Sequence, residues 1–132
     1  MSGSPISGFA HVAIAVTSLA EARRFYCGML GLDEVPRPDL GIDGMWLRVG
    51  DLQLHFIETD VMPVPGPGFP HFALHIPADV WTDKLNELVG AGIVFLMGPS
   101  ERVDFGVRVR AAFITDPAGN VVELTDAGPL NA

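Results

Sequence analysis

The order of the expected secondary-structure elements is the same in both halves of this sequence, which restricts the chain to a duplicated fold. Residues 9–16 are rich in β-branched side chains and predict a strand. A helix is expected next, because Ser18 with Glu21 three residues later matches a capping box and apolar residues follow at helical spacing. Three more strands are expected at residues 32–35, 45–49 and 52–58.

The second half repeats this order after a stiff connector. Residues 62–70 contain four prolines and two glycines, which predicts an extended spacer between two modules. A strand, a helix and three strands are then expected at residues 71–76, 78–91, 93–97, 108–115 and 121–125. The last two strands are joined by Asp-Pro-Ala-Gly-Asn at residues 116–120, a strong turn signal. We therefore expect an α+β chain of two βαβββ modules, residues 8–61 and 71–126, within a single domain of residues 1–132.

Length and charge narrow the classes of function. A chain of 132 residues can bury a core on folding, and its one cysteine, Cys27, excludes an internal disulfide. The formal charge of −8 argues against a nucleic-acid surface, but it is compatible with a small-molecule enzyme or with a binder of cationic ligands. We expect a cytoplasmic protein without a membrane segment, because the N-terminus does not resemble a signal peptide and no apolar run reaches about 18 residues.

Histidines in expected strands are the candidate metal ligands. His11 opens the first strand of the first half, and His71 opens the first strand of the second. The last strands of the two halves carry His55 and Glu123 at corresponding places. If a pseudo-two-fold axis relates the halves, these four groups converge near it. Imidazole and carboxylate ligands suit a divalent transition metal.

Strand alternation sorts the neighbours of these four residues. His71 and His75 share a face but lie about 13 Å apart along a straight strand, so they cannot both bind one ion. We expect His75 to be a pocket wall or a surface residue. Gln53 shares a face with His55 and is expected to line the same pocket. Glu58 has the opposite parity, which predicts a solvated or structural carboxylate.

Glu123 stands out among the acidic residues because it lies between Val122 and Leu124 in an apolar strand. Burial of a carboxylate there is costly unless it is paired or bound to a cation. The alternative to metal binding is a salt bridge to Arg108 or Arg110. These two arginines share a face, and either an anionic substrate or a structural role accounts for them.

Three segments resemble motifs of the vicinal oxygen chelate superfamily, which includes glyoxalase I, fosfomycin-resistance enzymes, bleomycin-binding proteins, methylmalonyl-CoA epimerase and extradiol dioxygenases. GFAHVAIAV at residues 8–16, together with residues 18–26 and 30–32, resembles the opening motif of the superfamily. HFAL at residues 71–74 resembles the first strand of its second module, and FITDPAGNVVEL at residues 113–124 resembles its closing hairpin. The resemblance spans residues 8–126.

This resemblance implies two βαβββ modules that form a cupped mixed sheet around one divalent metal ion, such as Fe, Mn, Ni, Co or Zn. It implies that His11, His71 and Glu123 are ligands, and that the protein is a homodimer with modules paired within or between chains. His55 falls where glyoxalase I has a glutamate and the epimerase a glutamine. His55 is therefore either a fourth ligand or an acid/base beside the metal. Because a histidine replaces one carboxylate, Glu123 is the carboxylate base that remains.

The resemblance favours an enzyme whose small substrate chelates the metal through vicinal oxygens. Isomerase or lyase chemistry and ring-cleaving dioxygenation, an oxidoreductase reaction, both remain open, since two histidines and one carboxylate also suit Fe(II) and O₂. We expect the substrate pocket to include Gln53, His75, Arg110 and Trp46. A fosfomycin-transferase is less favoured because residues 124–132 contain no arginine or lysine.

The alternative is a metal-free protein of the bleomycin-resistance type, which sequesters a cationic small molecule in an acidic, aromatic groove. The net charge and the aromatic residues Trp46, Phe56, Trp81 and Phe105 are compatible with this reading. The retained His11, His71 and Glu123 argue against it, because such a protein has no need of metal ligands.

Overall fold

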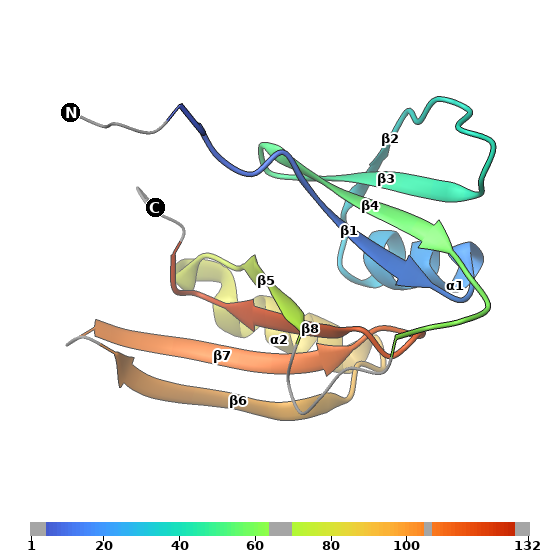
Figure 1. The fold of residues 1–132 in the computed structure, drawn as a ribbon. Coiled ribbons are helices and arrows are strands. Elements are labelled where there is room, and N and C mark those ends of the chain that lie inside the picture. Colours follow the sequence, from blue (N-terminus) through green and yellow to red (C-terminus); the bar gives the residue numbers. More distant parts are fainter. Residues whose placement is uncertain (1–4, 64–69, 105–106, 129–132) are drawn as a thin grey trace. The chain divides into compact units, whose positions relative to one another are not determined.

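The computed structural model describes residues 5–63, 70–104 and 107–128, and Figure 1 shows their arrangement. The chain divides into two compact units, Met1–Met62 and Pro63–Ala132. Most of the expected proline-rich connector, residues 64–69, lies outside the described residues. Each unit is described by itself below.

The first unit is a four-stranded sheet with one helical segment, and its strand order is β1-β4-β3-β2. β1 pairs in parallel with β4, whereas the other two pairings are antiparallel. The strands are β1 (His11–Val16), β2 (Asp33–Val35), β3 (Gly44–Val49) and β4 (Leu52–Glu58), and the helical segment is α1 (Leu19–Arg23), which continues as the π-helical turn η1 (Arg24–Met29).

The second unit has the same plan, with strand order β5-β8-β7-β6 and a parallel β5–β8 pair. Its elements are β5 (His71–His75), the 3₁₀ turn η2 (Ala78–Val80), α2 (Trp81–Gly90), β6 (Phe95–Asp104), β7 (Val107–Thr115) and β8 (Val121–Thr125). The predicted fold of two βαβββ modules is confirmed. In the described part of the chain, no helix is long and apolar enough to cross a membrane.

One expected strand is wrong in extent. The strand expected at residues 93–97 is β6, which begins at Phe95 and continues to Asp104 through the Gly98–Pro99 step. Its pairing with β7 shifts register on both sides of Met97. These irregularities allow the strand to continue through Gly98 and Pro99, two residue types that normally end a strand. A Cβ on Gly98 would lie 2.9 Å from the Ala111 carbonyl oxygen, which explains why this close crossing uses glycine.

Alternation along β3 and β4 gives the first sheet one apolar face. Met45, Leu47, Leu54 and Phe56 are almost fully buried. Phe56 lies against the ring of Tyr26 in the helical segment, with ring centroids 4.8 Å apart. The helix therefore covers this face, and the intervening residues of β3 and β4 face the other way.

The second sheet is built in the same way. Ile114, Val122 and Leu124 are buried on one face, and α2 contributes the buried Trp81 and Leu88. The side chain of the residue between Val122 and Leu124 therefore projects from the opposite face of β8.

The helix of the first unit begins as its capping pattern predicts. Oγ of Ser18 accepts a hydrogen bond of 3.1 Å from the Glu21 amide. Oε1 of Glu58 accepts one of 3.2 Å from the Leu19 amide, which makes Glu58 a structural carboxylate. Two of the amides that lack partners within the helix are thus satisfied by side chains.

Replacement of Ser18 by alanine should lower the free energy of unfolding by about 1 kcal/mol, because one helix amide loses its acceptor. Urea unfolding followed by circular dichroism measures the change. Thr82→Ala, at an exposed position in α2, is the control and should change stability by less than about 0.5 kcal/mol. Equal losses in both variants would contradict a capping role for Ser18.

Candidate functional site

Two histidines of the first unit come together on the face that the helix leaves open. β1 and β4 run in parallel with His11 opposite Gln53 and Ala13 opposite His55. The rings of His11 and His55 stack with centroids 4.0 Å apart and an interplanar angle of 14°. The first and last strands of this unit therefore bring together the two histidines that the sequence singled out.

His55 lies within a stack of three rings. Trp46, on the neighbouring strand β3, stacks on its other side at 4.2 Å with an interplanar angle of 4°. Nε2 of His55 donates a 2.8 Å hydrogen bond to Oε1 of Gln53, which fixes the ring orientation. With the hydrogen on Nε2, the lone pair available to a ligand or a proton is on Nδ1.

Three effects lower the pKa of His55 below its ordinary value: burial, then the neighbouring charge of His11, then that of Arg37. Each disfavours a positive charge on the ring. His55 is therefore neutral at neutral pH, the form that a metal ligand or a general base requires.

The second unit contains the other expected pair. Nε2 of His71 donates a 3.1 Å hydrogen bond to Oε1 of Glu123, and both side chains are largely buried, with 21% and 16% exposed. His71 lies opposite Val121, and Ala73 lies opposite Glu123. The carboxylate is thus partnered by an imidazole from the adjacent strand.

The same register places both pairs. In the first unit, His11 lies opposite Gln53, two residues before His55. In the second unit, His71 lies opposite Val121, two residues before Glu123. The two modules thus position His11 with His55 and His71 with Glu123 by one rule.

Phe113 is a site neighbour that our sequence reasoning missed. It lies opposite Glu123 on β7, as Trp46 lies opposite His55 on β3. Its ring meets His71 edge to face at 5.3 Å. Alignment of the two modules by strand register would have found Phe113, because it occupies the position equivalent to Trp46.

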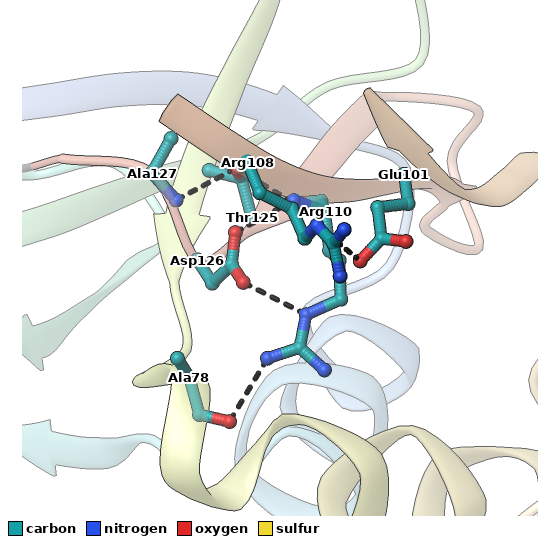
Figure 2. A network of polar contacts seen from close by, with 7 residues as sticks. All are labelled: Ala78, Glu101, Arg108, Arg110, Thr125, Asp126 and Ala127. Atoms are coloured by element: carbon teal, nitrogen blue, oxygen red, sulfur yellow. Dashed lines mark hydrogen bonds and ion pairs between the residues drawn. The ribbon is translucent and has the colours of Figure 1, made fainter. Parts of the chain in front are cut away.

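The arginines of β7 do not pair with Glu123 in this unit. Figure 2 shows Arg108 beside Glu101, at 3.6 Å, and Arg110 beside Asp126, at 2.8 Å. Nη2 of Arg110 also donates to the Ala78 carbonyl oxygen at 3.0 Å, at the start of η2. Arg110 therefore has a structural role within the second unit, and its expected part in a substrate pocket stays a prediction.

Other expected site residues are placed as follows. His75 is exposed on β5, opposite Thr125. Phe56 and Trp81 are 1% and 4% exposed, so their expected place in an aromatic groove is wrong: both belong to the cores of their units. Phe105 lies outside the described residues.

The donor set suits a divalent transition metal. Three imidazoles and one carboxylate are typical ligands for such an ion, and the lowered pKa of His55 favours the neutral ring that binds a metal. Across residues 5–63, 70–104 and 107–128, no group of three or more His, Cys, Asp or Glu side chains is gathered for metal binding. Each unit by itself thus provides a pair.

The ion pair between Arg110 and Asp126 gives a pH-dependent prediction. Burial raises the pKa of Asp126, but hydrogen bonds from the Arg110 amide and guanidinium outweigh it, so the net pKa lies below its ordinary value. A carboxyl whose pKa is lower in the folded state contributes stability above its unfolded pKa, about 4, and loses it as the pH falls through its folded pKa.

Asp126→Asn should therefore lower the free energy of unfolding at pH 7 by about 2 kcal/mol, and the difference should shrink below about pH 4. Chemical denaturation at a series of pH values measures both effects. Glu101→Gln is the matched control, since its ion pair to Arg108 is exposed and should contribute less than about 1 kcal/mol. A loss for Asp126→Asn that does not change with pH would contradict this account.

Comparisons with known proteins agree with this fold. Residues 8–124 match the family model of the Glyoxalase/Bleomycin resistance protein/Dioxygenase superfamily. Virulence protein STM3117 of Salmonella typhimurium (strain LT2) is 26% identical over 119 residues, 87% of this chain and 81% of that protein.

Solved structures share the fold, as two examples illustrate. One, described as a glyoxalase family protein from Bacillus anthracis, is 25% identical with a TM-score of 0.77 and covers 94% of this chain and 98% of its own. The fosfomycin resistance protein FosX from Listeria monocytogenes is 19% identical with a TM-score of 0.74, covering 95% and 96%. With a family match over nearly the whole chain, this protein belongs to the Glyoxalase/Bleomycin resistance protein/Dioxygenase superfamily.

Proposed function

We propose that this protein is a metal-dependent enzyme of the glyoxalase-like type, acting on a small substrate that chelates a divalent ion through vicinal oxygens. The observation that carries the proposal is the matched placement of His11 with His55 and of His71 with Glu123 in the two modules. The two modules carry residues that can bind a metal at the same strand positions. This is the pattern expected if each module supplies half of one ligand set.

In this proposal His11, His71 and Glu123 bind the ion, which is Fe, Mn, Ni, Co or Zn, and His55 is either the fourth ligand or an adjacent acid/base. A divalent ion, when bound, would polarise the two substrate oxygens and stabilise developing negative charge. Gln53 orients His55 through their 2.8 Å hydrogen bond. Such outer partners fix the tautomer and direction of a ligating imidazole.

The proton-transfer groups follow from the same residues. Glu123 is the carboxylate base of the site, because its side chain is 16% exposed and is partnered by an imidazole rather than by an arginine of its unit. His55 is neutral and can accept a proton on Nδ1 while Nε2 stays bound to Gln53. Isomerase or lyase chemistry uses such a transfer at carbon.

Purified parent protein should hold about one metal ion per chain, and His11→Ala and Glu123→Ala should each lose most of it, because each removes a ligand. Elemental analysis after incubation with Fe(II), Mn(II), Ni(II), Co(II) or Zn(II) and desalting gives the stoichiometry. His75→Ala is the control: it removes an exposed histidine from the strand that carries His71 and should retain the metal. A parent that stays metal-free would overturn the proposal.

The role of His55 and the reaction class need further measurements. Loss of metal in His55→Ala would identify a ligand, whereas retained metal with lost turnover would identify an acid/base. Hemithioacetals test isomerase or lyase chemistry, and catechols test ring cleavage. Turnover of a catechol only with Fe(II) and O₂ would assign the enzyme to the dioxygenases.

A metal-free binder of a cationic small molecule is the second candidate. Besides the net charge of −8, it is favoured by an open hollow of about 580 Å³ in the first unit, where three carboxylates could attract a cation. The hollow is lined by Thr17, Gly41, Ile42, Asp43, Glu58, Thr59 and Asp60. Saturable binding of bleomycin in EDTA, unchanged by His11→Ala, would favour this candidate over the enzyme.

The homodimer and the cytoplasmic location stay predictions. Light scattering coupled to size-exclusion chromatography tests the first on the purified protein.

A further inference from the structure

Arg37 occupies an unusual position in the first unit. It lies in the loop between β2 and β3, and its guanidinium rests against Gly44, the first residue of β3. A Cβ on Gly44 would lie 2.6 Å from the backbone carbonyl oxygen of Phe56 and 2.8 Å from both Cζ and Nη2 of Arg37. The absence of a side chain at Gly44 therefore leaves room for the paired strand and for the guanidinium.

Strand alternation identifies the face on which this guanidinium lies. A side chain at Gly44 would point to the same side as that of Trp46, two residues later, and Trp46 stacks on His55. Met45, between them, is buried on the opposite, helix-covered face. Arg37 thus shares the open face with the stacked rings, and its charge is one of the influences on His55.

The described residues of the first unit offer no partner that explains the position of the guanidinium. Nε of Arg37 is buried, and none of these residues accepts a hydrogen bond from it. Among the described residues, no carboxylate forms an ion pair with it, whereas Arg23 binds Glu34 at 2.9 Å. A buried N–H of a charged group without an acceptor is costly, so a site that retains one is prepared for an acceptor from outside.

We propose that Arg37 binds an oxyanion of the substrate, a carboxylate, phosphate or phosphonate, while the vicinal oxygens of the same molecule lie beside His55. This inference rests on the proposed function and adds the substrate class: a small acid. The planar fork of an arginine matches two oxygens of such a group. In a chain of net charge −8, a local cation is needed to hold an anion.

The spacing limits the size of the substrate. Gly44 lies two residues before Trp46 on β3, a distance of about 7 Å along the strand, and Trp46 lies opposite His55. Ile57, opposite Gly44, is 42% exposed and offers an apolar contact for the carbons between the two ends. The molecule is therefore short, with a chelating end and an acidic end.

The first arm of the test uses metal-free protein, so that it does not depend on the metal. Sodium phosphate and sodium succinate are titrated at constant ionic strength, with sodium chloride as reference, while tryptophan fluorescence and Tm are followed. The parent should show saturable binding of at least one of the two anions, and Arg37→Gln should weaken it about tenfold or more. Arg24→Gln removes the same charge from an exposed helical position and should bind like the parent.

The second arm uses Co(II)-loaded protein and three hydroxamates that chelate through vicinal oxygens. Acetohydroxamate has no acidic tail, succinic monohydroxamate has a carboxylate, and phosphonoacetohydroxamate has a phosphonate. The parent should bind at least one tailed compound about tenfold more tightly than acetohydroxamate, and Arg37→Gln should lose that preference. The tail that is preferred identifies the oxyanion.

The outcomes separate the two proposals. A parent that binds no cobalt contradicts the proposed function, while the metal-free arm still decides the role of Arg37. Equal anion binding by the parent and Arg37→Gln would overturn the assignment. Arg48 is an exposed arginine of β3 opposite Gln53, and loss of the preference in Arg48→Gln instead of Arg37→Gln would also overturn it.

Discussion

Parallel pairing between the first and last strands of each module is the constraint on which the site depends. A parallel pair cannot be closed by a hairpin, so the chain must cross over through a helix, and that helix covers one face of the sheet. The opposite face is left for function. Because β1–β4 and β5–β8 share one register, His11 and His55 occupy the same relative strand positions as His71 and Glu123.

The two faces of each sheet obey different physical rules. On the helix side, residues such as Leu47 and Ile114 are fully buried and are replaceable only by groups of similar shape. On the open side, two imidazole rings stack, and Nε of Arg37 is buried without a hydrogen-bond partner among the described residues, which costs stability. Local arrangements that cost stability and have no structural explanation are expected where a protein binds its ligand.

Several elements could be predicted from local signals. Ser18 and Glu21 marked the start of a helix, the Asp-Pro-Ala-Gly-Asn turn marked the last hairpin, and repeated strand positions marked four candidate ligands. Other features were missed because they depend on residues distant in sequence. β6 continues past Gly98–Pro99 because β7 provides its pairing, and Phe56 and Trp81 lie in cores rather than in a groove.

The sequence by itself determined the order of elements, the module repeat and the chemical identity of the metal-ligand candidates, since these follow from periodicity, turn residues and strand parity. Only the tertiary structure decided which charges are satisfied. Asp126 forms an ion pair with Arg110, whereas Arg37 lies against Gly44 and its Nε has no partner among the described residues. Pairing of this kind depends on which strands and loops become neighbours in space, and no local pattern encodes that.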